Sequence, residues 1–507
     1  MTTATYIVEV SWTGGTAFTG TTDNVTGKVL HAEWNRGRQF ASQLTGKAPA
    51  GQAIIRLNND GGTFSTRNAN SPIAELMIPG RAVRIRTTAP LGTTLWRGVI
   101  DSIENKVSLQ NDHVAILKCT GPLGYVNPVA VRVPMAVDQL TGAAIGTVLD
   151  KASWPAADRA IDTGQTTMKR FWVEAKPALD ALRNIEASEA GYLGESKDGK
   201  IVFEDRQHRL KGSYLASQST YSDNATAAIS FTDIQQEDPI KVIYNDFSAE
   251  VRRYVTGTAT SLWTLRDTGA DSPPIAYSGT FKVEAQFPFG NPTATIGAIA
   301  AASWTPLVAT TDWNVFSDTA GTGTNLNANI VVASSTYGQS MQITLTNTGT
   351  QSGFVTLLNV RGTALIEDNL SRMRAGDGES QSLYGIRSYA NPGQFVPSVA
   401  EAEDWAQFNL AIYGQPLQIE RVTLNANRSS AEMNEVLTRD ISDLVTISAT
   451  GRSDLGFTGL FFIEAEHHQV NADKTHWVTF DVSPATGYGG FWVIGKSELG
   501  ARTKPAY

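Results

Sequence analysis

The sequence has few of the residues on which most enzymes depend. It contains one cysteine, Cys119, and six histidines in 507 residues. A single cysteine excludes an intramolecular disulfide framework and a thiolate metal cluster. No Gly-x-Ser-x-Gly nucleophile motif and no His-Glu-x-x-His metal motif occurs. The sequence therefore predicts no catalytic residues and no enzymatic activity.

Positive charge and long apolar runs are also scarce. The net charge is −8 and the pI is about 5.4, which argues against a basic nucleic-acid-binding face. The N-terminal MTTATYIVEVSW alternates like a strand and lacks the basic and apolar regions of a signal peptide. The longest weakly polar run, Ile296–Ala302, is too short to cross a bilayer. We expect a protein made and folded in a cytoplasm.

What the chain does have favours β-structure in several units. A hydrophobic fraction of 41% with 18% charged residues is typical of a folded protein, and 507 residues exceed one ordinary core. Gly, Thr, Ser and Asn are plentiful, and long amphipathic runs are few. The fold class predicted is mainly β with small α/β parts.

Residues 1–128 are predicted to form a first β-barrel. Ala53–Leu57 is apolar and leads into the turn-forming Asn58–Gly62, and Arg81–Thr87 alternates between polar and apolar residues. Leu95–Ile103 and Val114–Cys119 are further strand candidates. Short strands separated by turns at this spacing are typical of a barrel or sandwich.

Residues 129–236 are predicted to form a small α/β unit, followed by a connecting strand at 237–256. Val137–Lys151 fits a short helix. Pro177–Ala190 fits a clearer helix that Gly191 ends, and a hairpin turned at Asp198-Gly199 follows it.

Residues 257–362 differ in composition from the rest of the chain. Only eight charged residues lie between Val255 and Gly362, namely Arg266, Asp267, Asp271, Lys282, Glu284, Asp312, Asp318 and Arg361. Alternation in NIVVAS, SMQITLTN and GFVTLLNV predicts strands. We expect an inserted β-sandwich.

Residues 363–507 are predicted to form a second barrel with a capping helix. Ser398 and Glu401 have capping-box spacing, and Gly414 is expected to end the helix that they begin. The strand candidates LQIERVTL, DLVTIS, GLFFIEAEHHQV and HWVTFDV follow.

Three groups of residues are candidates for a binding or metal site. The first is GFWVIGKS, Gly490–Ser497, which matches the spacing of a phosphate-binding loop. Its variable positions, Phe491 to Ile494, are bulky strand formers, and the ten residues after Ser497 leave no room for a useful helix. We predict no nucleotide binding and no cofactor.

The second group combines His467 and His468 with Glu464, Glu466 and His476. Adjacent residues of a strand point to opposite faces, so the two neighbouring histidines cannot join one site without a bulge. His476 lies across the expected hairpin and could pair with one of them. We predict no metal site; a polar strand face or a subunit contact is the favoured interpretation.

The third group is aromatic and lies in the low-charge segment: Trp263, Trp304, Trp313 and Tyr337. These rings could stack on sugars, or they could form the core of the sandwich. Aromatic residues in a small sandwich are more often core, and this is the favoured interpretation.

Four stretches, taken in order, give the chain a likeness to a known family. They are AIIRLNNDGGTFSTRNANSPIAELMIPGRAVRIRT followed by LWRGVIDSIEN, PALDALRNIEASEAGYLGESKDGKIVFEDR, IKVIYNDFSAEVRRY, and GLFFIEAEHHQVNADKTHWVTFDVSP. In this order the chain resembles the tail hub (baseplate hub, minor tail) proteins of tailed bacteriophages. The low-charge insertion departs from the family pattern, and no peptidoglycan-cleaving module is attached.

The resemblance implies a homotrimer in which two tube-like β-barrels per subunit form a pseudo-sixfold ring. Such a ring joins the tail tube to the tip of the virion and encloses the channel through which genomic DNA passes without specific binding. The implied partners are distal tail and tail tube proteins, tip or fibre proteins and the tape measure protein. The alternative is a receptor- or glycan-binding tail-tip protein that acts on a host surface glycan through the insertion.

Overall fold

The computed structural model describes residues 2–38, 47–107, 113–237, 240–265, 268–288, 297–415, 419–451, 455–492 and 504–505. Within these ranges the chain forms twenty-eight strands and six helices, so the mainly-β prediction is confirmed. None of the described helices is both long enough and apolar enough to cross a membrane.

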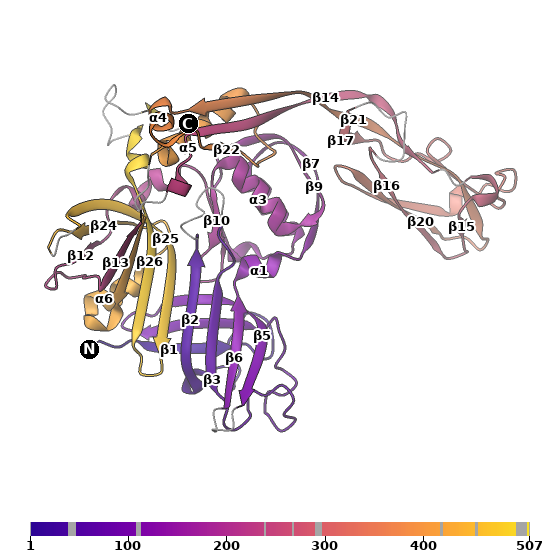
Figure 1. The fold of residues 1–507 in the computed structure, drawn as a ribbon. Helices are drawn as coiled ribbons and strands as arrows, with labels where there is room; N and C mark the ends of the chain where they lie inside the picture. The colour runs from indigo at the N-terminus through magenta and orange to yellow at the C-terminus, as the bar shows by residue number, and fades with distance from the viewer. Residues whose placement is uncertain are drawn as a thin grey trace.

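A twelve-stranded sheet dominates the molecule, and it combines strands from both ends of the chain (Figure 1). The N-terminal strands are β1 (Thr5–Val10), β2 (Val29–Gly37), β3 (Gln52–Asn58), β4 (Ala82–Ala89), β5 (Thr94–Val107) and β6 (His113–Thr120). The later strands are β12 (Thr220–Ser222), β13 (Asp233–Glu237), β23 (Ile419–Asn425), β24 (Leu444–Ala449), β25 (Phe457–Asn471) and β26 (His476–Pro484).

The two halves of this sheet meet where β2 pairs with β25. The main path runs β1-β4-β5-β6-β3-β2-β25-β26-β23-β13, and β24 branches from β25 with β12 beside it. The joining ladder is antiparallel and extends from His31 opposite Asn471 to Gly37 opposite Ala465. In the described residues β1 and β13 are the open ends of the path, so closure into barrels stays a prediction.

One hydrophobic core serves both halves of the sheet. Val8, Trp34 and Ile55 from the N-terminal strands belong to the same buried cluster as Val422 and Phe480 from the C-terminal strands. The helix α6 (Ser430–Thr438) adds Met433, Val436 and Leu437 to this cluster. Because apolar surface is shared across the joint, the two halves stabilise each other.

A small α/β layer lies beside the sheet. It consists of α1 (Pro122–Val126), β7 (Ala130–Leu140), α2 (Thr141–Lys151), β8 (Arg159–Ile161), β9 (Thr167–Pro177), α3 (Ala178–Glu189), β10 (Tyr192–Glu195) and β11 (Ile201–Glu204). The predicted helix at 177–190 and the hairpin after it are confirmed. The predicted helix at 137–151 begins later than expected, because residues 137–140 pair with β9 as the end of β7. Ala190, with φ 58°, takes the left-handed conformation at the end of α3.

A long two-stranded ribbon leaves this body. Its strands β14 (Asp246–Thr264) and β21 (Gly353–Gly376) pair from Asp246 opposite Gly376 to Thr264 opposite Asn359. At its near end lie α4 (Gly378–Tyr384), β22 (Ser388–Ala390) and α5 (Val399–Tyr413), and α5 packs Trp405 and Ala406 against Phe247 and Val251. The predicted start of α5 is correct, since Ser398 Oγ accepts a hydrogen bond of 3.1 Å from the backbone N–H of Glu401.

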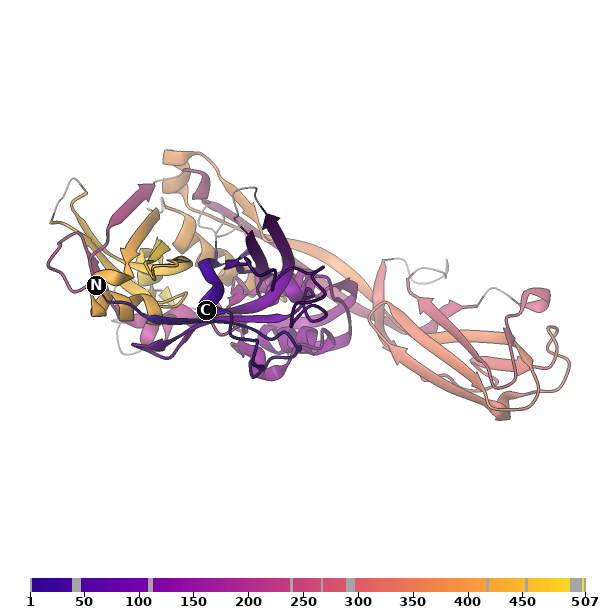
Figure 2. The same cartoon turned by 90° about the horizontal axis from the view of Figure 1, so that it is seen from below.

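The far end of the ribbon carries two small sheets that project from the molecule (Figures 1 and 2). We call residues 257–364 the arm. One sheet adds β15 (Pro274–Ile275), β17 (Ala298–Trp304) and β18 (Trp313–Phe316) to the ribbon, and the other consists of β16 (Thr280–Gln286), β20 (Ser340–Asn347) and β19 (Ile330–Thr336). Buried residues of both sheets, among them Val315, Val355, Ile343 and Leu345, form one core between them.

Candidate functional site

The histidine group lies at the joint of the large sheet, and the structure separates its two adjacent members. His467 is exposed and lies 3.8 Å from Asp481, whereas His468 is buried on the other face of β25. The prediction that the two histidines point to opposite faces is confirmed. His476, on β26, pairs with His468 as the sequence suggested, with 2.9 Å between His468 Nδ1 and His476 Nε2.

Tyr6, His476 and His468 form a buried hydrogen-bonded chain. The Tyr6 hydroxyl donates to His476 Nδ1 over 2.7 Å, so that His476 Nε2–H can donate to His468 Nδ1. The remaining ring nitrogen of His468 lies 3.6 Å from Glu466, and the indole of Trp34 stacks on the His468 ring with 4.9 Å between centroids. Burial lowers the pKa of His476 well below its ordinary value, and His468 beside it adds to the effect. His476 is fully buried, so its ring is closed to solvent.

The two glutamates of the group are held by arginines. Arg36 Nε donates to Glu466 over 2.6 Å, and Arg209 donates to both oxygens of Glu464 over 2.5 and 2.9 Å. We call Arg36, Arg209, Glu464 and Glu466 the sheet joint. Burial alone would raise the pKa of Glu466, but Arg36 and His468 beside it hold the value at about 2. Each carboxylate is thus committed to a buried ion pair.

The sheet joint also ties the α/β layer to the sheet. Arg36 donates to the backbone carbonyl of Glu195 over 3.1 Å and lies 2.7 Å from Asp440. The Glu195 carboxylate in turn accepts the backbone N–H groups of Gly51 and Leu123, over 2.9 and 2.7 Å. Segments far apart in the sequence therefore meet at one polar cluster. In the described residues no three His, Cys, Asp or Glu side chains are grouped so that they could hold a metal ion.

The three tryptophans of the third group belong to the arm's core. Trp313 is 5% exposed, and Trp263 and Trp304 pack against the same cluster. The Trp304 indole N–H donates to the carbonyl of Tyr337 over 2.6 Å, and the Tyr337 ring lies 5.5 Å from the Arg132 guanidinium. The favoured interpretation of the tryptophans as core is confirmed.

Around the phosphate-loop match the structure describes only the first residues. Phe491 and Trp492 form the short strand β27, which pairs in parallel with β28 (Lys504–Pro505). Residues 493–503, including Lys496 and Ser497, lie outside the described residues.

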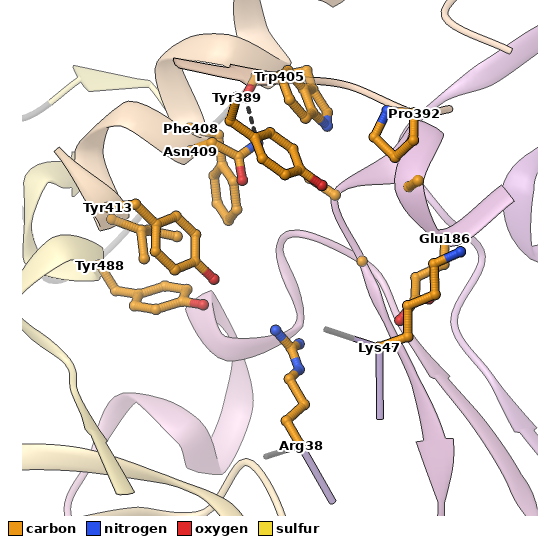
Figure 3. A pocket seen from close by; sticks show the side chains of 14 residues that line it. Arg38, Lys47, Glu186, Tyr389, Pro392, Trp405, Phe408, Asn409, Tyr413 and Tyr488 are labelled. Carbon is orange, nitrogen blue, oxygen red and sulfur yellow. Dashed lines mark hydrogen bonds between the residues drawn. The ribbon is translucent and has the colours of Figure 1, made fainter. Parts of the chain in front are cut away.

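An aromatic-lined cavity lies between α3 and α5 (Figure 3). Trp405, Phe408 and Tyr413 of α5 form one wall, with Tyr488 and Arg38 beside them. The Arg38 guanidinium stands 4.5 Å from the centre of the Tyr192 ring and 3.9 Å from Glu464. The open volume of about 110 Å³ suits a handful of water molecules, not a nucleotide or a sugar chain.

Sequence reasoning missed the arginines that organise this region. Arg36 and Arg209 have no local motif, because their partners lie 430 and 255 residues away. One signal was present: Glu464 and Glu466 alternate with apolar residues on a strand that otherwise reads as buried. Buried carboxylates demand cationic partners, so the spacing pointed to arginines elsewhere in the chain.

Solved structures with similar folds include tail proteins. The tail protein from Neisseria meningitidis MC58 has a TM-score of 0.51 at 9% identity, covering 95% of this chain and 98% of that chain. The 43 kDa tail protein of prophage MuSo2 from Shewanella oneidensis has a TM-score of 0.48 at 9% identity, covering 95% and 99%. The prophage tail protein gp18 from Listeria monocytogenes EGD-e has a TM-score of 0.42 at 7% identity, covering 94% of each chain.

No protein-family model matches the chain, and no curated protein matches its sequence. The likeness to the Neisseria protein extends over nearly the whole of both chains, so this chain has the fold of a phage tail protein. The resemblance inferred from the four sequence stretches is confirmed at the level of the fold.

Proposed function

We propose that this protein is a structural tail hub protein of a phage virion. In this proposal it forms a trimeric, pseudo-sixfold ring at the tail tip, joins the tail tube to the tip and encloses the DNA exit channel. The observation that carries the proposal is the tail-protein fold shared over 95% of this chain and 98% of the Neisseria tail protein.

The architecture of the large sheet supports a ring. Two half-sheets in each subunit, joined through β2 and β25, would supply six half-sheets to a trimer. In the described residues β13 has a strand neighbour, β23, on one side only. An uncovered strand edge invites pairing with another chain, and a ring subunit placed there would cover it. Head-to-tail contacts of this kind close into rings when the rotation allows it.

The charge of the protein supports passage of DNA without binding. A net charge of −8 leaves no surplus of cations to retain phosphates, and DNA that contacts few cations is held weakly. The partners in this proposal are distal tail and tail tube proteins, tip or fibre proteins, and the tape measure protein. Its location is the virion tail tip, after assembly in the host cytoplasm.

The proposal has no enzymatic component. Three buried titratable groups of the large sheet, His476, Glu464 and Glu466, are engaged with His468 or with arginines. Their arrangement supports a role in holding the sheet halves together.

Cryo-electron microscopy of assembled tails with imposed and unimposed symmetry tests the proposal. We expect three copies of the chain in one ring on the tail axis, with the large sheet facing the channel. Six copies in a ring, or density for the chain away from the axis, would refute it. The mass of the isolated protein is a separate measurement, because ring contacts can require the neighbouring tube.

The second candidate is a receptor-binding tail-tip protein. The observation that favours it is the arm, which extends far from the body on a two-stranded ribbon (Figure 2). Because Trp313 and Trp304 are part of the arm's core, a glycan would have to use other side chains.

A further inference from the structure

Two pockets lie at the root of the arm, between the ribbon strand β14 and the paired strands β7 and β9. Figure 1 shows β7 and β9 near the ribbon. Both pockets are lined by Arg252 and Tyr254 of β14. Their open volumes are about 530 and 480 Å³, within the range of ligand-binding clefts and several times that of the cavity near α5. We call the two together the root groove.

One end of the root groove is aromatic. Trp172, Tyr254 and Phe395 line it, and each is partly exposed. The Trp172 and Tyr254 rings meet edge to face with 6.2 Å between centroids. In the described residues the side chains of Lys176 and Gln394, which line the same pocket, have no hydrogen-bond or ion-pair partner. Partly exposed rings with unused polar groups beside them suit the alternating apolar faces and hydroxyls of a sugar chain.

The other end of the root groove is cationic. Lys169, Arg170, Arg252 and Arg253 line it against two carboxylates, Asp138 and Asp368. Lys169 is 2.7 Å from Asp138, and Arg252 is 3.6 Å from Glu367. In the described residues the Arg170 side chain donates only to the backbone carbonyl of Lys169, and the Arg253 side chain has no ion pair or hydrogen bond.

The unused guanidinium groups are notable in an acidic protein. The chain as a whole carries a net charge of −8, yet this pocket has four cations and two anions in its lining. An arginine without a carboxylate partner offers two parallel N–H donors that match a carboxylate. The cationic end is therefore suited to a ligand that carries carboxylates.

Backbone irregularities shape the walls of the root groove. Asn369, with φ 29°, is the extra residue of a bulge in β21 where Arg252 and Arg253 pair with Leu370 and Asp368. Asp138 and Ala175, on β7 and β9, also have positive φ values of 49° and 46°. A bulge re-aims the side chains next to it, and Arg252 and Arg253, which flank this one, both line the cationic pocket.

We propose that the root groove binds an acidic oligosaccharide, with its carboxylates on Arg170 and Arg253 and its ring faces on Tyr254, Trp172 and Phe395. The groove lies at the base of the arm and not on the arm's own tryptophans. The inference stands independently of the ring proposal, since it concerns the surface of a single subunit.

The test is isothermal titration calorimetry of the full-length protein at physiological ionic strength. The probes are hexasaccharides of galacturonic acid, sialic acid and hyaluronan, with neutral maltohexaose and hexaglutamate as comparison ligands. We expect at least one acidic hexasaccharide to bind with a Kd of about 1 mM or tighter, and the two comparison ligands to bind at least about tenfold more weakly.

Two variants locate the binding. Arg170→Gln with Arg253→Gln should weaken acidic-sugar binding by about tenfold or more, since each charged pair is lost. Tyr254→Ala should weaken it as well, through loss of the stacking face. The double variant Arg56→Gln with Arg67→Gln makes the same change of charge at exposed sites elsewhere and should bind as the parent does. Thermal unfolding of each variant establishes that it is folded.

Three results would overturn the proposal. One is the failure of all three acidic hexasaccharides to bind the parent protein. Another is equal binding of hexaglutamate, which would identify a site for acidic peptide. The third is binding that the Arg170/Arg253 double variant retains in full while its unfolding temperature matches the parent's.

Discussion

Single buried charges hold the two halves of the large sheet together. Arg36 and Glu466 come from β2 and β25, and their atoms approach to 2.6 Å out of contact with water. A buried ion pair gains little over an apolar pair, but removing one partner leaves an uncompensated charge and costs about 3–5 kcal/mol. These ion pairs therefore destabilise any fold in which β2 and β25 do not pair, because the charges would then be buried without partners.

Glu466→Gln should destabilise the protein in a pH-dependent way. The folded-state pKa of Glu466, about 2, lies below its ordinary value of 4.5. A lowered pKa contributes stability that is complete above 4.5 and is lost as the pH falls toward 2. We expect a loss of about 3 kcal/mol at pH 7, and a difference from the parent that shrinks between pH 4.5 and 2. Urea unfolding at a series of pH values measures both quantities.

The matched control is Glu75→Gln, at an exposed position. It should leave the stability unchanged to within about 0.5 kcal/mol, because substitutions at exposed positions remove few contacts. A constant deficit of Glu466→Gln from pH 7 to pH 2 would contradict the assignment of the ion pair.

At the scale of secondary-structure elements, the pairing of β2 with β25 depends on a glycine. Gly37 has φ 105°, and a Cβ at this position would lie 2.3 Å from the carbonyl oxygen of Glu464 and 2.6 Å from Cα of Ala465. Both are backbone atoms, which cannot move without shifting the strand. The close approach of the two strands therefore excludes any side chain at this end of the joint.

Gly37→Ala should lower the free energy of unfolding by about 2–4 kcal/mol, because the new Cβ clashes with β25 and alanine is strained at this φ. Gly27→Ala is the control, since a Cβ there meets no atom within 4 Å; its effect should stay within about 0.5 kcal/mol. Urea unfolding followed by tryptophan fluorescence compares the two. Equal stability of both variants would show that the β2–β25 approach is looser than described.

Over the whole molecule, the hydrophobic cores divide between body and arm. The buried members of the two arm clusters all lie between Leu262 and Ala364, and no buried residue of the three largest body clusters lies in that range. Arm and body also touch through polar contacts at the base. These include Arg132 to Glu284 at 2.8 Å and Ser340 to Glu174 at 2.6 Å. Loss of the arm would remove few apolar contacts from the body.

Replacing residues 257–364 by Asn-Gly should leave a folded body. Thr256 and Leu365 are cross-strand partners, so a two-residue turn can close the ribbon there. We expect a soluble protein that still enters the tail, measured by circular dichroism and by incorporation into particles. Failure to fold would contradict the inserted-unit prediction.

The same deletion separates the two candidate functions. A hub whose arm contacts only neighbouring tail proteins should give particles that adsorb to host cells as the parent does. If the arm recognises a receptor, particles should assemble but adsorb poorly. Adsorption kinetics with intact and deleted particles measure the difference.

Local patterns in the sequence determined the elements and some of their faces. The alternation of Tyr6 to Val10, the capping of α5 by Ser398 and the helix–hairpin unit at 177–206 each depend on neighbours a few residues away. The opposite orientation of His467 and His468 follows from the two-residue period of a strand. The helix α6 was missed although Ser429 and Glu432 have capping-box spacing and Ser429 caps the helix.

Only the tertiary structure decided which strand edges pair with each other. The pairing of β2 with β25, the arginine partners of Glu464 and Glu466, and the root groove all join residues that are hundreds of positions apart or on separate elements. A strand pattern specifies which face is buried but leaves its edge open to many partners, because backbone hydrogen-bonding groups are alike in every strand. The shared core and the buried charges select one pairing among them, and that selection exists only in the folded chain.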